Sequence, residues 1–372
     1  MDKKPIAESY RRNAAILEIQ DLSVTFRQRK GLFQSEDLPV ISRLNVTVNQ
    51  GEIVAVVGAS GSGKSLLAHG ILGILPANAR ISGEMNFLGE PLTTERIRKL
   101  RGKEIALVPQ GVTYLDPLMK VGAQVREQQP GKEGKRRQKE LFSAYGLPEK
   151  TEERYPFECS GGMNRRILLS TALMERPKLI VADEPTPGMD LEQAKRAMAD
   201  FRAFASQGNG VLLITHDLPL AISAADRIAV FYAGTTVEEA PSSDFAREEL
   251  LRHPYTRALW RAMPQNGFQA IPGTQPYVKD MPKGCVFGPR CPKFTKECLG
   301  DIPMRVVRQG AVRCILQHDE HKIREARKSK DSQKSQEERE RQNAQKSQKE
   351  RECQNTQRIQ EEREVQKYAG GR

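Results

Sequence analysis

The sequence lacks any run of apolar residues long enough to cross a lipid bilayer. Of its 372 residues, 38% are hydrophobic and 28% are charged. No stretch approaches the roughly 18 consecutive apolar residues of a membrane-spanning helix. The N-terminal segment MDKKPIAESYRRN also lacks the apolar core of a secretory signal peptide. We therefore expect a soluble cytoplasmic protein.

Cysteines are few, and nothing in the sequence suggests an oxidising compartment. Six cysteines in a cytoplasmic chain of this length are expected to be reduced or bound to metal rather than paired in disulfides. The net charge of +12 is a weak indication of acidic partners such as nucleic acid or lipid headgroups. Because no dense Lys/Arg cluster accompanies it, we expect no nucleic-acid partner.

Apolar side chains are almost absent from the last fifty-odd residues. This segment contains a repeat, KSQEERERQNAQ followed by KSQKERECQNTQ. Each repeat would leave an offset of about 120° around a helix, so no continuous apolar stripe can form. Residues 319–372 are therefore predicted to be a disordered or marginally helical tail. A partner-binding arm is the alternative.

The rest of the chain alternates strand and helix patterns. LEIQDLSVTFRQ and VISRLNVTVNQG are predicted strands, and GLFQSEDLP between them is a predicted loop. KEIALVPQ, KLIVADEP, VLLITHD and RIAVFYAG are buried strand patterns, and LEQAKRAMADFRAFAS is an amphipathic helix. This order predicts an α/β fold with a mainly parallel sheet covered on both faces.

A glycine-rich loop, GASGSGKS, carries the strongest chemical signal. It follows the short apolar strand EIVAVV and leads into the helical segment SLLAHGILGIL, which is the context of a phosphate-binding loop. Glycines let the backbone N–H groups and the helix N-terminus surround phosphate oxygens. Lys64 is expected to reach the β- and γ-phosphates, and the Ser65 hydroxyl to bind Mg²⁺. The predicted nucleotide-binding residues of this loop are Gly58, Ser60, Gly61, Gly63, Lys64 and Ser65.

Two adjacent carboxylates end another buried strand, in LIVADE. Asp183 is expected to meet Mg²⁺, usually through water. Glu184 is expected to orient or deprotonate the water that attacks the phosphate. Together with the phosphate-binding loop, this pair predicts nucleotide hydrolysis.

A second anion site is predicted at Ser160, Gly161 and Gly162, which open the helical segment MNRRILLSTAL. Glycines at a helix N-terminus expose N–H groups to a negative ligand. The chain already has a phosphate-binding loop for its own nucleotide. A second anion site is useful if it binds the nucleotide held by another copy.

With these motifs in this order, residues 15–318 resemble the ATP-binding cassette family, the ATPase subunits of ABC transporters. The resemblance implies four further roles. Phe26 would stack on adenine, and Gln110 in VPQG would touch Mg²⁺ and sense the membrane subunit. Asp190 in PGMD would belong to the D-loop, and His216 in ITHD would lie near the γ-phosphate. The signature reads CSGGM where the family commonly has LSGGQ, and the D-loop reads PGMD where SALD is common.

The C-terminal segments HPYTRAL, GCVFGPRCPKFTKEC and VRC resemble the extension of oligopeptide, dipeptide and nickel importer ATPases. Four cysteines with the spacing C-x5-C-x6-C-x15-C lie there, at Cys285, Cys291, Cys298 and Cys314. The tight C-x2-C pairs of standard zinc sites are absent. We expect a [4Fe–4S] cluster, with zinc or reduced structural thiols as the alternatives.

The expected organisation has three parts. An ABC ATPase domain spans 14–250 with an inserted helical subdomain at about 112–172, a small cysteine-bearing lobe spans 251–318, and the charged tail spans 319–372. Glu184 and His216 are the expected catalytic residues. The expected metal ligands are Ser65, Gln110 and Asp183 for Mg²⁺ and the four cysteines for the cluster.

The resemblance implies hydrolysis of ATP that powers uptake of peptides, nickel or other metal chelates. The chain would lie on the cytoplasmic face of the membrane, with a second ATPase subunit, two transmembrane permeases and an extracytoplasmic substrate-binding protein. A heterodimer of ATPases is favoured, and LDPLMKVGAQV is the expected docking segment. Two alternatives are a non-transport ATPase linked to nucleic acid and a scaffold subunit like those of the carbon–phosphorus lyase complex.

Overall fold

The structure is a computed structural model that describes residues 14–30, 34–127, 129–187, 189 and 191–316. The chain divides into two units, Met1–Ile315 and Leu316–Arg372. The predicted repeat tail lies outside the described residues, as do Asp190 and Cys353.

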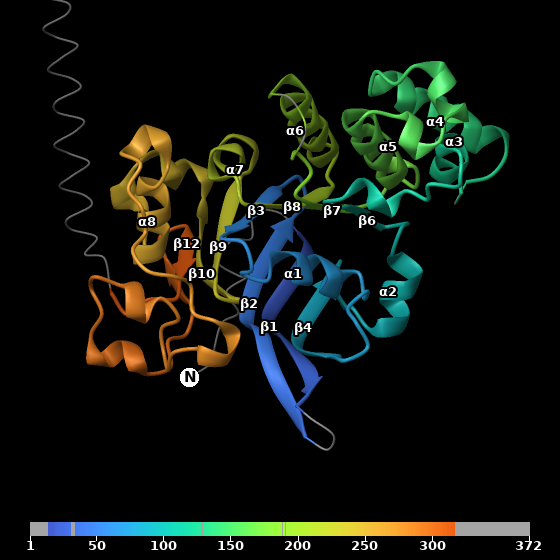
Figure 1. Cartoon of the computed structure of the whole chain (residues 1–372). Coiled ribbons are helices and arrows are strands. Elements are labelled where there is room, and N and C mark those ends of the chain that lie inside the picture. The colour runs from blue at the N-terminus through green and yellow to red at the C-terminus, as the bar shows by residue number, and fades with distance from the viewer. Residues whose placement is uncertain (1–13, 31–33, 128, 188, 190, 317–372) are drawn as a thin grey trace, which may run out of the picture. The chain divides into compact units, whose positions relative to one another are not determined.

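An eight-stranded sheet forms the centre of the first unit, in the order β11-β12-β10-β9-β3-β8-β7-β6 (Figure 1). Its parallel part is formed by β3 (Ile53–Gly58), β6 (Ile105–Val108), β7 (Leu179–Asp183), β8 (Gly210–Thr215) and β9 (Arg227–Tyr232). These are the continuous apolar runs in the sequence, as expected for strands that are buried on both faces. The predicted mixed α/β architecture with a mainly parallel core is confirmed.

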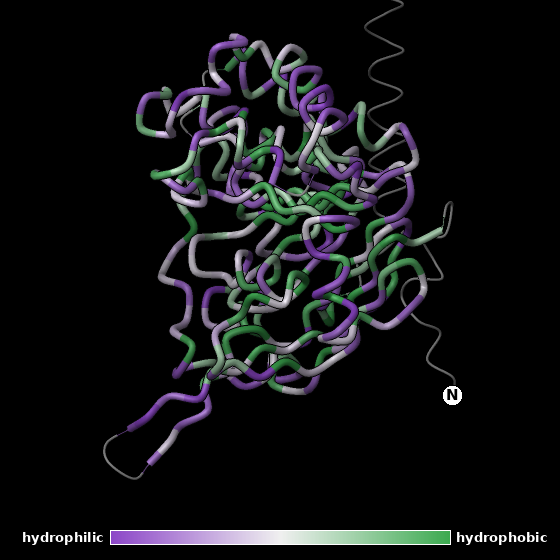
Figure 2. The backbone as a smooth tube through the Cα atoms, turned by 90° about the vertical axis from the view of Figure 1, so that its right-hand side faces the viewer, coloured by the Kyte–Doolittle hydropathy of each residue, from purple (hydrophilic) through white to green (hydrophobic). Residues whose placement is uncertain are grey.

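A second, antiparallel sheet has the order β2-β1-β4-β5. It is built from β1 (Ala15–Arg29), β2 (Ser35–Asn49), β4 (Ala79–Phe87) and β5 (Glu90–Pro91). The predicted loop GLFQSEDLP is wrong from residue 35 onward, because residues 35–39 belong to β2. Cross-strand partners explain this, since Asp37 lies opposite Arg27 and opposite charges stabilise a polar hairpin. Figure 2 shows that the far end of this hairpin is hydrophilic.

Helices flank the central sheet and also form a separate group at one end of it. The flanking helices are α1 (Lys64–Ile71), α2 (Thr94–Leu100), α6 (Leu191–Ser206) and α7 (Leu218–Ala224). The group consists of α3 (Val121–Val125), α4 (Lys132–Ala144) and α5 (Gly161–Leu173), with short 3₁₀ turns between them (Figure 1). This helical group lies in the chain between β6 and β7.

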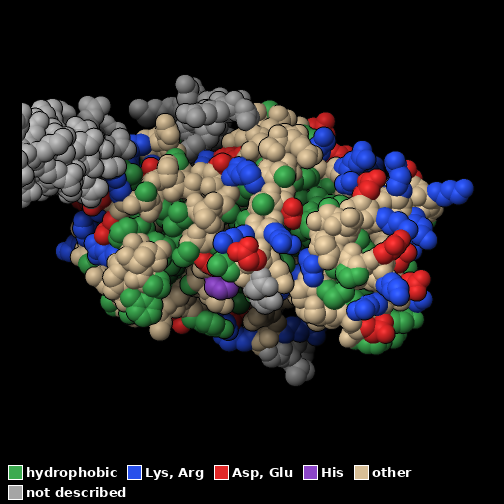
Figure 3. Space-filling view, turned by 90° about the horizontal axis from the view of Figure 1, so that it is seen from above, with side chains coloured by type: hydrophobic (Ala, Val, Ile, Leu, Met, Phe, Trp, Pro, Cys, Tyr) green, Lys and Arg blue, Asp and Glu red, His purple; other side chains and the backbone are tan. Residues whose placement is uncertain are grey.

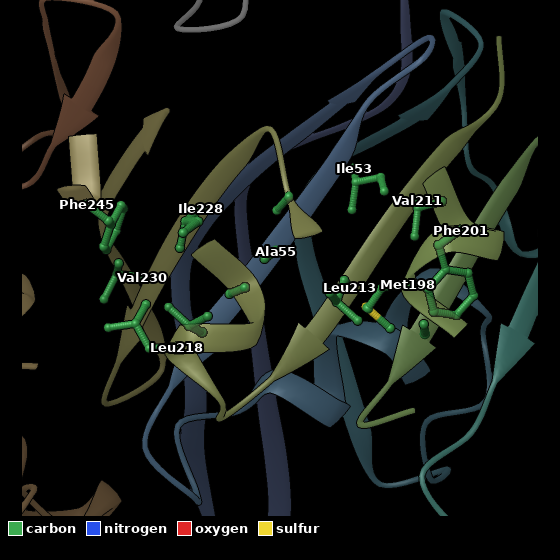
Figure 4. Close-up of a cluster of buried hydrophobic side chains, with 14 of the residues drawn as sticks. Ile53, Ala55, Met198, Phe201, Val211, Leu213, Leu218, Ile228, Val230 and Phe245 are labelled. Atoms are coloured by element: carbon green, nitrogen blue, oxygen red, sulfur yellow. The ribbon is translucent and has the colours of Figure 1, made fainter. Parts of the chain in front are cut away.

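The core lies on both faces of the parallel strands. On one face, side chains of β3, β8 and β9 meet those of α6 and α7 (Figure 4). Met198 and Phe201 of α6 pack there against Leu213, and Leu218 of α7 lies near Val230. The other face packs against α1 and the antiparallel sheet. Since each fully buried aliphatic side chain contributes about 1.5–3 kcal/mol, this packing fixes the sheet register.

Part of the C-terminal region extends the central sheet. It contains α8 (Pro254–Arg261), several 3₁₀ turns, β11 (Arg305–Val307) and β12 (Gly310–Val312). Strand β12 pairs with β10 (Thr235–Pro241). Three aromatic rings pack together where the C-terminal region meets β9. The centroid of the Tyr232 ring lies 4.4 Å from that of Tyr255 and 5.3 Å from that of Phe287.

A buried ion cluster joins the C-terminal region to β10. Arg252 and Glu238 have side chains that are 1% and 0% exposed, and Arg252 Nη1 lies 3.3 Å from Glu238 Oε1. Arg252 Nη2 lies 2.8 Å from Asp244 Oδ2, and its Nε donates to the Val307 carbonyl. Glu238 also accepts hydrogen bonds from the backbone N–H groups of Arg252 and His253.

We expect Arg252→Met to lower the free energy of unfolding by about 3–5 kcal/mol, because it leaves the Glu238 carboxylate buried without its cation. Urea unfolding of the full chain measures this change. The control is Arg136→Met, which breaks the exposed Arg136–Glu133 pair and should leave the unfolding midpoint unchanged. Equal effects of the two substitutions would contradict the role of burial.

Candidate functional site

The candidate site lies where the parallel strands end. The carboxyl ends of parallel strands meet at one edge of a sheet, where ligands bind in α/β proteins. The loop after β3, the carboxylates that end β7 and His216 after β8 therefore come together (Figure 1). Figure 3 looks down on this edge, where acidic, basic and histidine side chains lie side by side near the centre.

The phosphate-loop glycines are required by geometry. A Cβ atom on Gly58 would lie 2.4 Å from the Phe231 carbonyl oxygen, so no larger residue fits where β3 ends. Gly61 and Gly63 have φ values of 76° and 93°, a left-handed backbone that favours glycine. Helix α1 begins directly after Gly63, so its first N–H groups face the loop.

A cleft of about 600 Å³ is lined by five segments that are distant in the sequence. Its lining residues are Val40, Ser60, Gly61, Gly63, Lys64, Ser65, Leu66, Gln110, Glu184 and His216. Most of these were predicted as site residues. Val40 and Leu66 were not, because both are aliphatic residues without a chemical signature in the sequence. The size and polar lining of the cleft suit a nucleotide phosphate chain.

Lys64 lies inside its own loop. Its Nζ donates to the carbonyl oxygens of Gly58, at 2.8 Å, and Ala59, at 3.1 Å. Burial lowers the pKa of Lys64, while the Glu184 and Asp183 carboxylates raise it in part. This ammonium group can exchange its two carbonyl partners for phosphate oxygens, which bind a cation more strongly.

The neighbouring Asp183 and Ser65 suit a hydrated Mg²⁺. Asp183 Oδ1 is buried and has no hydrogen-bond partner among the described residues. Burial raises the pKa of Asp183, and a hydrogen bond from Ser65 partly lowers it again. Carboxylate, hydroxyl and water oxygens are the ligands that Mg²⁺ prefers. Ser65 and Gln110 line the cleft, and Asp183 lies next to Ser65, so the residues present fit this metal.

Glu184 and His216 form a close pair, with 2.8 Å between Glu184 Oε1 and His216 Nδ1. The Glu184 side chain is 9% exposed, whereas that of His216 is 65% exposed and faces the cleft. Glu184 Oε2 is buried and has no hydrogen-bond partner in the described part of the chain. The pair therefore offers a fixed carboxylate with one acceptor oxygen unused.

The signature residues lie elsewhere. Ser160 caps α5, its hydroxyl accepting a hydrogen bond from the Met163 N–H at 3.2 Å. The space beside Gly161 is open, and a Cβ on Gly162 would lie 2.8 Å from Gln193 Oε1. These residues do not line the cleft of their own chain.

Phe26 also lies outside the cleft lining, and it packs at the edge of the core beneath the antiparallel sheet. Its partners in the hairpin register are Leu38 and Ala79. Asp190 is not among the described residues, so its predicted place in the D-loop stays a prediction.

Three of the four C-terminal cysteines lie near one another. The Cys285 N–H donates to the Cys298 carbonyl at 2.8 Å. Burial raises the pKa values of Cys285 and Cys291, and the neighbouring thiols raise them further. Within the described ranges, however, no three cysteine, histidine or acidic side chains are grouped so that they could hold a metal ion. The described thiols therefore do not form a closed ligand group in this structure.

Among the helices that the structure describes, none is both long and apolar enough to span a membrane.

Comparisons with known proteins identify two family regions. The ABC transporter family matches residues 41–187, and the "Oligopeptide/dipeptide transporter, C-terminal region" family matches residues 237–298. The dipeptide transport ATP-binding protein DppD of Haemophilus influenzae is 37% identical over 303 residues, which cover 76% of this chain and 90% of that protein. The oligopeptide transport ATP-binding protein OppD of Escherichia coli is 34% identical over 317 residues, covering 80% and 92%.

Solved structures agree with this relationship. A dimeric bacterial ABC transporter cassette superposes with a TM-score of 0.52 at 25% identity, covering 61% of this chain and 98% of that one. An ATP-binding subunit of an ABC transporter gives the same TM-score at 24% identity and covers 63% and 92%, which supports the fold. The chain therefore belongs to the ATP-binding subunits of ABC transporters, a family of ATPases coupled to transport, and it carries the oligopeptide/dipeptide transporter C-terminal region.

Proposed function

We propose that this chain binds Mg·ATP in the cleft beside β3 and hydrolyses it to power the uptake of peptides through partner membrane subunits. The observation that carries this proposal is the meeting of Lys64, Gln110, Glu184 and His216 in one cleft. The relatives DppD and OppD are dipeptide and oligopeptide transport proteins, which supports peptides as the cargo. Nickel or other metal chelates are the second class of cargo that the C-terminal resemblance suggests.

Binding begins with the phosphate chain of ATP. The N–H groups of the glycine loop and of the first turn of α1 surround the phosphate oxygens. Lys64 gives up its bonds to the Gly58 and Ala59 carbonyls and pairs with the β- and γ-phosphates. Ser65, Gln110 and Asp183 would hold Mg²⁺, which would neutralise charge on these phosphates.

Hydrolysis uses the close carboxylate–histidine pair. Glu184 Oε2, which lacks a partner among the described residues, accepts a hydrogen bond from the attacking water. The water oxygen bonds to the γ-phosphorus, and the bond from that phosphorus to the β–γ bridging oxygen breaks. The water proton passes to Glu184 or to the phosphate product, leaving ADP and inorganic phosphate. His216 holds Glu184 Oε1 in place during this step.

A second ATPase subunit completes the site. Ser160, Gly161 and Gly162 do not line their own cleft, so we assign them to the nucleotide of the partner. A hollow of about 810 Å³ between α6 and α7 adjoins the cleft and shares Glu184 and His216 with it. Leu191 on its rim is 69% exposed, as expected of a surface that a partner covers. By the resemblance, this partner is a different ATPase rather than a second copy.

The membrane subunits would dock beside Gln110, on the segment 115–125. Leu118 in this segment is 86% exposed, and the nearby Tyr114 is 56% exposed. Two large apolar side chains exposed on one short segment are available to a partner, which supports this assignment. Two permeases would bind here, one per ATPase, and would receive cargo from an extracytoplasmic binding protein. The chain would then act at the cytoplasmic face of the membrane.

For the C-terminal cysteines, we propose the [4Fe–4S] cluster on the basis of their number and spacing. Cys285, Cys291 and Cys298 lie in one neighbourhood, which supports a common ligand. Because the described thiols do not form a closed ligand group, metal content decides between a cluster, zinc and free thiols.

We expect Glu184→Gln to reduce the ATP turnover of the assembled transporter by at least about 100-fold while ATP affinity stays near wild type. The amide keeps the shape of the side chain but loses its capacity to take a proton. The matched control is Glu133→Gln on the exposed face of α4, which should not change turnover. Wild-type turnover in Glu184→Gln would overturn the role assigned to Glu184.

We expect Lys64→Ala to weaken ATP binding by roughly 10- to 100-fold, since charge-assisted hydrogen bonds are worth about 1.5–3 kcal/mol. Calorimetric titration of the full-length chain with Mg·ATP measures the dissociation constant. Lys139→Ala, which breaks the exposed Lys139–Glu149 pair, is the control and should bind ATP normally. An unchanged dissociation constant in Lys64→Ala would count against the phosphate loop.

We expect protein purified without oxygen to contain about four iron and four sulfide ions per chain and to absorb visible light as a [4Fe–4S] protein does. Cys291→Ser should lose both. Cys159→Ser removes a cysteine outside the C-terminal region and should keep the cluster. Iron-free wild-type protein would leave zinc, if found, or reduced thiols as the state of these cysteines.

A further inference from the structure

Arg165 connects the helical group to the backbone of Glu184. It lies on α5, one turn after the helix begins, and its side chain is partly buried. Its Nη1 donates to the Glu184 carbonyl at 3.2 Å and lies 3.4 Å from the Pro185 carbonyl. Burial lowers the pKa of Arg165, and the Glu184 carboxylate partly raises it. The guanidinium therefore lies directly behind the proposed catalytic residue.

The backbone that Arg165 contacts is strained. Glu184 has a φ of 48°, a left-handed conformation that costs about 1–3 kcal/mol in a residue other than glycine. Its N–H donates to the Ile214 carbonyl of β8 at 2.8 Å. Because Pro185 follows it, Glu184 has fewer allowed backbone conformations than it would have before another residue. A residue in such a conformation keeps it only when neighbouring groups hold it.

Three contacts on different sides hold Glu184. Strand β8 fixes its N–H, and His216 fixes one carboxylate oxygen. Arg165 fixes its carbonyl. Rotation of the Glu184–Pro185 peptide would turn the carboxylate away from the cleft, and Arg165 is the group that opposes this rotation from the carbonyl side.

The neighbouring Arg166 has a different set of partners. Its Nη1 donates to the carbonyls of Tyr145 and Gly146, at 3.0 and 3.1 Å, and its Nε donates to the Gly162 carbonyl. All three partners lie within the helical group. Two adjacent arginines on one helix thus make similar carbonyl contacts, but only Arg165 reaches the end of β7.

We infer that Arg165 is a positioning residue for ATP hydrolysis: it keeps the strained Glu184 peptide oriented so that the carboxylate faces the attacking water. This inference rests on the role proposed for Glu184. Helix α5 also begins with Ser160 and Gly161, which are assigned to the partner's nucleotide. A shift of α5 when the partner binds would therefore reach Glu184 through Arg165.

The experiment compares Arg165→Met and Arg165→Lys with Arg166→Met in the full-length chain within its assembled transporter. Arg165→Met should lower kcat for ATP by about 10- to 100-fold and leave KM within about twofold, because ground-state binding does not use Arg165. Arg165→Lys keeps a cationic donor and should recover most of kcat. Arg166→Met should keep kcat within about twofold of wild type, even if its melting temperature falls.

A double variant separates positioning from a general structural effect. If Arg165 acts through the Glu184 carboxylate, adding Arg165→Met to Glu184→Gln should cause no further loss of residual hydrolysis in single-turnover assays. Additive losses would overturn the inference, as would a rise in KM with unchanged kcat, or wild-type kcat in Arg165→Met.

The Glu184→Gln single variant separates the two proposals. If Glu184→Gln is inactive and Arg165→Met is fully active, the catalytic role of Glu184 is supported and the positioning role of Arg165 is wrong. If Glu184→Gln turns over ATP normally, both proposed roles are wrong. Should Arg165→Met be unfolded, Arg165→Gln takes its place in the same comparison. A loss of kcat in Arg165→Gln that Arg165→Lys largely restores supports the inference, and wild-type kcat in Arg165→Gln overturns it.

Discussion

The contact on which the site depends is the close approach between the end of β3 and its neighbour β9. The Phe231 carbonyl of β9 leaves room only for glycine at position 58. The chain must therefore turn into the phosphate loop at this point, and α1 must begin directly above the sheet edge. Because β3 lies between β8 and β9 in a buried parallel arrangement, a shift in register would bury the loop or expose the core.

The same register places the acidic half of the site. Strand β7 pairs with β8 so that Asp183 lies beside Ile214, and the Ile214 carbonyl then receives the Glu184 N–H. Two carboxylates and the Lys64 ammonium are thus held in a partly buried edge, where charges interact more strongly than in water. Burial lowers the pKa of Lys64 and raises the pKa of Asp183, and the attraction between the Lys64 ammonium and the neighbouring carboxylates opposes the shift of Lys64. This balance leaves a site that gains much from a triphosphate and a divalent cation.

Sequence patterns predicted the parts of the site that consist of short contiguous motifs. The apolar strand, the glycine loop and the strand-end carboxylates are each contiguous, and the structure brings them together as expected. Strand β10 was not predicted, because its sequence TTVEEAP has the polar composition of a solvent-exposed segment. In fact Glu238 and Glu239 are buried there, since Arg252 and Arg227 from distant segments pair with them. The predicted loop at 35–39 failed for a similar reason, because pairing of charged side chains across the hairpin was not visible in one strand alone.

Val40 and Arg165 show why long-range contacts limit prediction. Nothing near Val40 in the sequence suggests a ligand, and Arg165 next to Arg166 looks like ordinary surface charge on a helix. Only the fold shows that one arginine stays within the helical group while the other reaches the Glu184 carbonyl. Since α5 carries both this contact and the Ser160 cap, one helix links the residues proposed to meet a partner's nucleotide to the peptide behind the proposed base. In the proposed pair of subunits, such a helix would transmit closure without any change in the sheet, because the strands that hold Asp183 and Lys64 are fixed by their own register.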